Sequence, residues 1–254
     1  MRTLTLLCSL SVLASACAFH PFDLGDSTEG DDGHSRWSVS DGLCPGLGSC
    51  GLEVPVAAGA TIRLSVDVPD RLLAELRPIV VSGDGVIGDV DRDPEHDQLY
   101  FDVSAGGAGT IELAIVDSES EVVDRSRVHV VEPVGLECGE LTEGAVVGYG
   151  MDAMSSDRHD ITIVRSTESA PTPQLGCLVT DAEGSPLLSA DLVHWHVAET
   201  DPLLLYVRSN PFDWIPDGEA DGARVYLSPA ADAGTATLEA SFGDRLETFA
   251  ITIE

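Results

Sequence analysis

Several stretches of this sequence place an apolar residue at every second position, and this alternation constrains the fold more than any other feature. It is clearest at 61–68, 110–115, 235–242 and 249–253. A period of two predicts strands that turn one face to a core and the other to water. Gly, Ser and Asp separate the strands, for example at 82–85. The pattern predicts an all-β protein built from a sandwich or barrel.

An internal repeat divides the chain into two units. The segment 99–113 is echoed by 225–238, and each copy reads as a strand, a turn containing Ala-Gly-Thr, and a second strand. A period of roughly 125 residues is the length of a domain, not of a solenoid repeat. We therefore expect two tandem domains, at 42–132 and 133–254.

These units resemble bacterial immunoglobulin-like domains. The end of each half is similar to the group-2 type, in which a Gly-Thr pair precedes an alternating strand. The segment 177–197 resembles the invasin/intimin type, where a strand, an Asp-x-x-Gly-x-Pro turn and a second strand carrying an aromatic residue form one hairpin. The resemblance implies two immunoglobulin-like β-sandwich domains that act as spacers, adhesion modules or accessory domains. It implies no catalytic residues.

Residues 1–16 have the layout of a bacterial signal peptide. A positive start is followed by a short apolar run at 4–13 and by small residues at 14–16. The run is shorter than the ~20 residues that a membrane-spanning helix needs. Cys17 then stands where a lipobox cysteine would be lipidated, although Ala14 occupies the position that is usually Leu. Cleavage as an ordinary secretory signal is the alternative.

Residues 17–41 are rich in Gly, Ser, Asp and Glu and have no periodicity. Such a composition predicts a flexible acidic linker. A lipid on Cys17 would anchor it to a membrane, and Ala18, by resemblance to enterobacterial lipoproteins, favours the outer membrane. Without the lipid the protein would be secreted or periplasmic. The net charge of −31 argues against nucleic acid as a partner, because phosphates are bound by cations.

Four cysteines remain once Cys8 and Cys17 are set aside, and an even number in an exported protein predicts disulfides. Three connectivities are possible. We expect the local pairs, because each then stays within one domain. Metal thiolates are the alternative, but no second pair or nearby histidine completes a zinc pattern. The expected pairs are Cys44 with Cys50 and Cys138 with Cys177.

Acidic residues alternate through 89–97 and make a candidate calcium site. Carboxylate oxygens at close spacing suit calcium, and the first three acids copy the start of an EF-hand loop. Pro94 then stands where that loop needs Gly, and Tyr100 stands where it needs Glu. A solvated acidic hairpin loop is the alternative. The candidate ligands are Asp89, Asp91, Asp93, Glu95 and Asp97.

Two histidines, His194 and His196, flank Trp195. On a strand the two histidines would share one face and the tryptophan would take the other. The pattern favours a core tryptophan with two half-exposed neighbours. A transition-metal site is the alternative, for which the sequence places no third ligand.

Motifs for catalysis do not occur: there is no G-x-S-x-G, no H-E-x-x-H and no phosphate-binding glycine loop. We expect an exported envelope lipoprotein that acts as a non-enzymatic structural or interaction module without a cofactor. Its expected partners are the membrane and an unidentified envelope or surface protein. Two alternatives stay open: a calcium-dependent adhesion module, and an anchored enzyme or accessory subunit with a site distributed over loops.

Overall fold

The computed structural model describes most of the chain beyond its N-terminal segment. The described residues are 27–39, 51–68, 73–141, 154–155, 159–163, 174–189, 191–198, 205–208, 218–229 and 233–254. Residues 1–26, Cys44 and Cys50 lie outside them. The expectations on the signal peptide, the lipid on Cys17 and the Cys44–Cys50 disulfide therefore lie outside the described residues. Within the described part, no helix is long and apolar enough to cross a membrane.

The first domain is a sandwich of two sheets. One sheet has the strand order β1-β2-β4-β7-β6 and the other β3-β9-β8-β5. A 3-10 turn, η1 (Leu73–Glu75), precedes β5. The strands are β1 (Thr28–Glu29), β2 (Arg36–Val39), β3 (Val56–Ala57), β4 (Thr61–Asp67), β5 (Arg77–Ser82), β6 (Gly85–Asp93), β7 (Gln98–Ala105), β8 (Gly109–Val116) and β9 (Val122–Val131).

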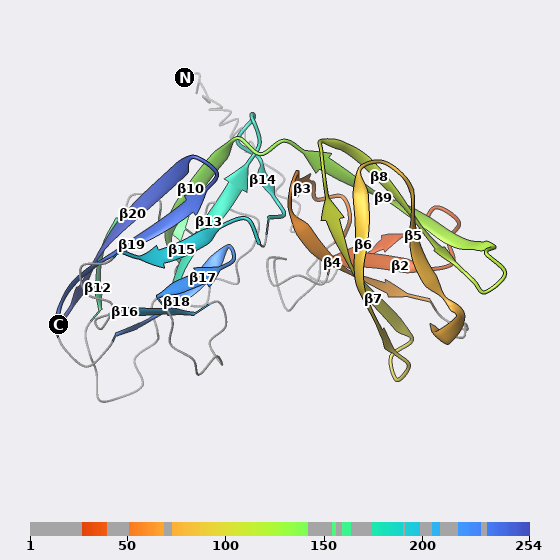
Figure 1. Ribbon diagram of the computed structural model, residues 1–254, viewed down its shortest axis with the longest axis horizontal. Helices are drawn as coiled ribbons and strands as arrows, with labels where there is room; N and C mark the ends of the chain where they lie inside the picture. The colour runs from red at the N-terminus through yellow and green to blue at the C-terminus, as the bar shows by residue number, and fades with distance from the viewer. Residues whose placement is uncertain are drawn as a thin grey trace, which may run out of the picture.

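The second domain repeats this plan. Its sheets have the orders β11-β10-β13-β18-β16, with β14 paired to β13, and β12-β20-β19-β15-β17. Figure 1 shows the two sandwiches next to each other, joined by the connection from β9 to β10. The strands are β10 (Gly135–Leu141), β11 (Met154–Ser155), β12 (Asp160–Ile163), β13 (Gln174–Thr180), β14 (Pro186–Leu187), β15 (His194–Val197), β16 (Leu205–Arg208), β17 (Glu219–Asp221), β18 (Arg224–Pro229), β19 (Gly234–Phe242) and β20 (Arg245–Ile253).

Both domains have immunoglobulin topology. In this fold the strands A, B, E and D form one sheet and C, F and G form the other. The first sheets, β2-β4-β7-β6 and β10-β13-β18-β16, follow the order A-B-E-D. The second sheets, β9-β8-β5 and β20-β19-β15, follow G-F-C, and a short strand runs parallel to G in each domain. The expected fold class, all-β with two sandwiches, is confirmed.

The strands that alternate in sequence are the strands that build the cores. The four predicted stretches correspond to β4, β8, β19 and β20, and every second residue of β7 is buried. Each core contains a fully or almost fully buried tryptophan. Trp37 lies edge-on to Phe101 at 6.2 Å between ring centroids, and Trp195 lies 6.1 Å from Phe249. Such aromatic pairs add roughly 1 kcal/mol beyond the area that they bury.

The repeated segments form equivalent strands in the two domains. The segment 99–113 covers most of β7 and the start of β8, and 225–238 covers most of β18 and the start of β19. In each copy the two strands belong to opposite sheets. The small residues between them therefore lie where the chain crosses from one sheet to the other. The strand after the crossing then forms a hairpin with the next strand, β8 with β9 and β19 with β20.

The expectation that 177–197 forms one hairpin is wrong in its second half. β13 and β14 do pair across the turn, where the carboxylate of Asp181 accepts a hydrogen bond from the Ser185 N–H at 2.7 Å. β15 with Trp195 lies in the opposite sheet. The ladder stops because the backbone of Leu188 bonds to the first domain instead of to β13.

The expected linker 17–41 is also wrong where the structure describes it. Residues 27–39 form β1, a tight turn and β2, and β2 pairs with β4. The side chain that holds this hairpin is Asp124 on β9, which is fully buried. Its carboxylate accepts hydrogen bonds from the Ser35 hydroxyl at 2.6 Å and from the backbone N–H groups of Asp32 at 2.9 Å and His34 at 3.0 Å.

The buried carboxylate of Asp124 is held in its charged form. Burial acts to raise its pKa, but the hydrogen bonds from Ser35, Asp32, Arg125 and His34 together outweigh it, and the pKa lies below its ordinary value. The turn fits so closely over Asp124 that a Cβ on Gly30 would lie 2.3 Å from a carboxylate oxygen. The network continues inward, because the Trp37 indole N–H donates to the Ser35 hydroxyl at 2.8 Å.

We predict that Asp124→Asn destabilises the first domain by about 2 kcal/mol, because an amide nitrogen would face donors that lose their acceptor. A lowered folded-state pKa gives stability that is present above the unfolded value near 4 and is lost as pH falls through the folded value. The difference between wild type and variant in urea unfolding should be constant above about pH 5 and shrink below about pH 4. Asp117→Asn is the control, since Asp117 caps an exposed turn. Equal losses in the two variants would contradict the role of Asp124.

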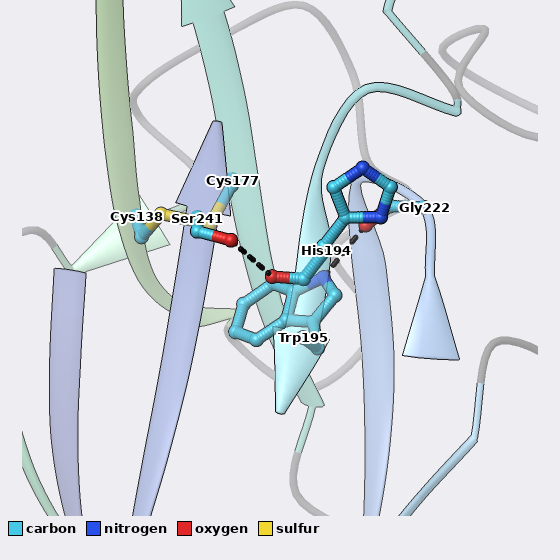
Figure 2. Close-up of a disulfide and its surroundings, with 6 residues drawn as sticks. All are labelled: Cys138, Cys177, His194, Trp195, Gly222 and Ser241. Atoms are coloured by element: carbon cyan, nitrogen blue, oxygen red, sulfur yellow. Dashed lines mark hydrogen bonds between the residues drawn. A yellow bond between two sulfur atoms is a disulfide. The ribbon is translucent and has the colours of Figure 1, made fainter. Parts of the chain in front are cut away.

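The predicted disulfide between Cys138 and Cys177 is confirmed. The two residues are direct partners on β10 and β13, with Cα atoms 4.0 Å apart, and both side chains are buried. The Cys177 N–H donates to Ala223 on the other side of β13. The cysteines therefore form a pair without mutual backbone hydrogen bonds, which is the closer of the two antiparallel pairings. Figure 2 shows the bridge together with Trp195 from the facing sheet.

Replacing both cysteines with serine should lower the stability of the second domain. The bridge closes a loop of 39 residues, for which chain entropy gives about 4 kcal/mol as an upper value. Urea unfolding of the Cys138→Ser/Cys177→Ser protein measures the loss. A non-reducing digest of the wild type should release one peptide pair linked through these residues. Linkage of either cysteine to Cys44 or Cys50 would contradict the pairing.

Candidate functional site

The two domains contact each other through the segment that leads from β14 to β15. The Leu188 N–H donates to the Pro55 carbonyl at 2.9 Å, and the Ala57 N–H donates to the Leu188 carbonyl at 2.8 Å. Val56 and Leu188 are thereby paired as a parallel bridge. The second domain thus extends, by one residue, the sheet edge of the first domain at β3.

A carboxylate strengthens this contact beside the bridge. The Thr61 N–H, at the start of β4, donates to both carboxylate oxygens of Asp191 at 3.0 and 3.2 Å. The interaction is exposed, so its net contribution is modest. It nevertheless fixes a second point about five residues from the bridge on the first-domain chain. Two fixed points restrict rotation of one domain against the other more than one can.

Apolar side chains from both domains are buried around the contact. They belong to one continuous hydrophobic cluster that includes residues of both sandwiches. The buried members next to the contact in the sequence are Val56, Ala57 and Ala60 on the first domain and Leu187, Leu188 and Val193 on the second. Interfaces between domains usually permit relative motion unless they are large or apolar. Here motion would expose apolar surface and break backbone hydrogen bonds of roughly 1 kcal/mol each.

The alternating acids of the calcium hypothesis lie along an edge strand. Asp89, Asp91 and Asp93 are on β6, and Glu95 and Asp97 are in the turn to β7. Asp89 and Asp93 lie four residues apart on one extended strand, which separates their Cα atoms by about 13 Å, whereas all the ligands of a calcium ion lie within about 2.6 Å of it. The structure does not bring the five carboxylates together. Among the described residues, no group of three or more His, Cys, Asp or Glu side chains could hold a metal ion.

The acids have other partners at this edge. Asp91 forms an ion pair with Arg63, which also reaches Asp102 at 3.1 Å. Asp93 accepts a hydrogen bond from His96 Nδ1 at 2.7 Å, and this bond lowers the pKa of Asp93. Because β6 ends its sheet, its row of charges also discourages pairing with another chain, which is a common protection of edge strands.

The flanking histidines stand where the sequence placed them. Trp195 is 1% exposed, while the side chains of His194 and His196 are 62% and 47% exposed. The indole N–H donates to the Gly222 carbonyl at 2.6 Å. The prediction of a core tryptophan between two exposed histidines is confirmed.

A polar cleft of about 340 Å³ lies beside the N-terminal hairpin. Ser35 contributes a hydroxyl group to the lining of this cleft. The hydroxyl donates a hydrogen bond to Asp124 and accepts one from the Trp37 indole N–H. A serine with both bonds made in this way is not a free nucleophile. The cleft is lined by Glu29, Gly33, His34, Ser35, Arg36 and Asp67.

The strand order gives both domains an immunoglobulin-like fold. No family model and no curated protein matches its sequence. It resembles domains 5–6 of the S-layer protein SbsC, with 16% identity over 79% of this chain and 92% of that chain and a TM-score of 0.31. It also resembles the adhesin InvE of Yersinia pseudotuberculosis, with 13% identity, coverage of 79% and 56%, and a TM-score of 0.29.

A β-glycosidase from Bacteroides vulgatus is similar to a comparable degree, with 15% identity over 77% of this chain and 23% of that chain and a TM-score of 0.28. These likenesses concern the fold alone. No site residue is carried over from any of them, and the functional residues are those that the contacts above define.

The sequence analysis missed the contact between the domains. The segment 186–193 was expected to continue a hairpin, and its apolar residues were assigned to a single domain. The available signal is the run Pro-Leu-Leu before a polar turn. The run does not alternate apolar and polar residues. A short apolar stretch of this kind is consistent with burial on both faces, as occurs for a segment that lies between two domains.

Proposed function

We propose that this protein is a non-enzymatic module of the bacterial cell envelope, in which two immunoglobulin-like sandwiches act as one rigid arm. The observation that carries the proposal is the contact between the domains. It combines a backbone bridge at Leu188, a carboxylate at Asp191 and a shared apolar cluster. An arm that holds a binding partner at a set distance from a surface requires such a fixed junction.

The polar side chains of the described residues support a structural role. The Ser35 hydroxyl and the Asp124 carboxylate are used to dock the N-terminal hairpin. Arg63 on β4 and Asp91 on β6 form an ion pair across the strand between them, β7. These interactions stabilise the strands and turns of the fold.

The location in the envelope rests on the sequence. Residues 1–16 have the layout of an export signal, and Cys17 follows as a site for lipidation. The lipid would place the arm on the outer membrane, with an envelope or surface protein as its partner. A net charge of −31 favours a partner with a basic contact surface, because complementary charge speeds encounter and excludes acidic competitors.

Residual dipolar couplings of backbone amides test the rigid arm. Alignment tensors fitted separately to 51–131 and 135–254 should agree in magnitude and orientation for the wild type. Asp191→Ala, which removes the acceptor of the Thr61 N–H, should make the two tensors diverge. Asp181→Ala is the matched control, because Asp181 caps a turn within the second domain. Different tensors in the wild type would refute the rigid arm.

Replacing the lipidation site tests the anchor. We predict that Cys17→Ser moves the protein from the membrane fraction to the soluble fraction of the envelope, because one polar residue replaces the acyl attachment point. Intact mass of the wild type should show an acyl addition on a chain that begins at Cys17. A mature mass without acyl groups, or an unchanged membrane fraction for the variant, would refute the anchor while leaving the rigid arm intact.

A further inference from the structure

The outer face of the second domain carries two histidines with a shared environment. His194 and His196 are two residues apart on β15 and point to solvent, while Trp195 between them points to the core. Figure 2 shows the imidazole of His194 and the indole of Trp195 leaving the strand in different directions. The two imidazoles are therefore neighbours on one open face of a rigid sheet.

Each imidazole is held by a carboxylate of the adjacent strand β17. His194 is the direct cross-strand partner of Asp221, and His196 is that of Glu219. His194 Nδ1 lies 2.5 Å from Asp221 Oδ1, and His196 Nδ1 lies 3.4 Å from Glu219 Oε1. The His194 contact is a hydrogen bond, which a carboxylate accepts only from a protonated Nδ1, so in the neutral ring of His194 the lone pair is on Nε2. Glu219 lies beside Nδ1 of His196 and favours the same tautomer there.

This arrangement is the one that protein metal sites use. Histidines that bind metals commonly give their other ring N–H to a carboxylate, which fixes the tautomer and raises the basicity of the ligating nitrogen. Same-face neighbours on a strand lie about 6.6 Å apart at Cα, and two imidazoles can lean together from that spacing.

We propose that His194 and His196 bind one transition-metal ion through their Nε2 atoms, with Asp221 and Glu219 orienting the rings. Imidazole ligands suit Zn²⁺, Cu²⁺ and Ni²⁺, whereas Ca²⁺ and Mg²⁺ prefer oxygen. The two histidines provide two ligands, and water completes the coordination. The site is open to solvent, so it can also join this face to a second molecule.

Zinc titration of the untagged full-length protein tests the site. Isothermal titration calorimetry in excess Ca²⁺, which occupies carboxylates but not imidazoles, should show one Zn²⁺ per chain. In long-range ¹H–¹⁵N spectra the Nε2 resonances of His194 and His196 should shift together. Binding should weaken as the pH is lowered, because protonated imidazole cannot ligate.

Variants separate this site from general binding to an acidic protein. His194→Gln/His196→Gln should abolish the zinc isotherm, and either single change should weaken it at least about tenfold. Asp221→Asn should weaken it about tenfold without changing the stoichiometry, as expected for a residue that acts through the ring it holds. His129→Gln, at an exposed histidine of β9, is the matched control and should bind zinc like the wild type.

All the substituted side chains are exposed, so unchanged thermal melting checks that each variant folds. Equal zinc affinity of the double variant and the wild type would overturn the proposal. A shift of only one of the two Nε2 resonances would overturn the shared site as well. Neither outcome bears on the rigid arm, whose test uses different residues.

Discussion

The structure depends on the need to satisfy every backbone and side-chain polar group that its strands bury. Within each sandwich the ladders do this, but the strand ends and the N-terminal hairpin need other partners. The buried carboxylate of Asp124 accepts three hydrogen bonds from the hairpin. At the edge strand β3, the backbone of Leu188 forms hydrogen bonds with the Pro55 carbonyl and the Ala57 N–H. Both solutions use long-range partners, and together they decide what lies against the first domain.

The contrast between local strand ladders and long-range hydrogen-bond partners explains which features the sequence could predict. Alternation is a local property, so β4, β8, β19 and β20 were predictable from the period of two, and the repeat indicated two domains. The pairing of Cys138 with Cys177 followed from a preference for local bridges. The hairpin at 27–39 could not be separated from a linker, because its turn is polar and its anchor, Asp124, lies about ninety residues away. A buried acid on a strand looks like an exposed one until its partners are known.

The same limit affected the candidate sites. The acids of 89–97 were interpreted as a loop that could surround an ion, whereas β6 extends three of them along a sheet edge, where Asp91 forms an ion pair with Arg63 of β4. The histidines beside Trp195 were placed correctly on one face. Their carboxylate partners, Asp221 and Glu219, could not be assigned because the register between β15 and β17 is set by the intervening fold. Spacing identifies which residues share a face, but it does not identify what faces them.

The docked hairpin also determines how this protein would carry a mechanical load. A pull from the N-terminal side would reach the first sandwich at β1 and β2, which are the first strands of the described chain. β2 is bonded along β4, and the turn between β1 and β2 is bonded to Asp124 on β9. β9 lies in the opposite sheet and leads directly to the second domain. Tension is thus shared between both layers near its point of entry, and the first strands need not peel away alone.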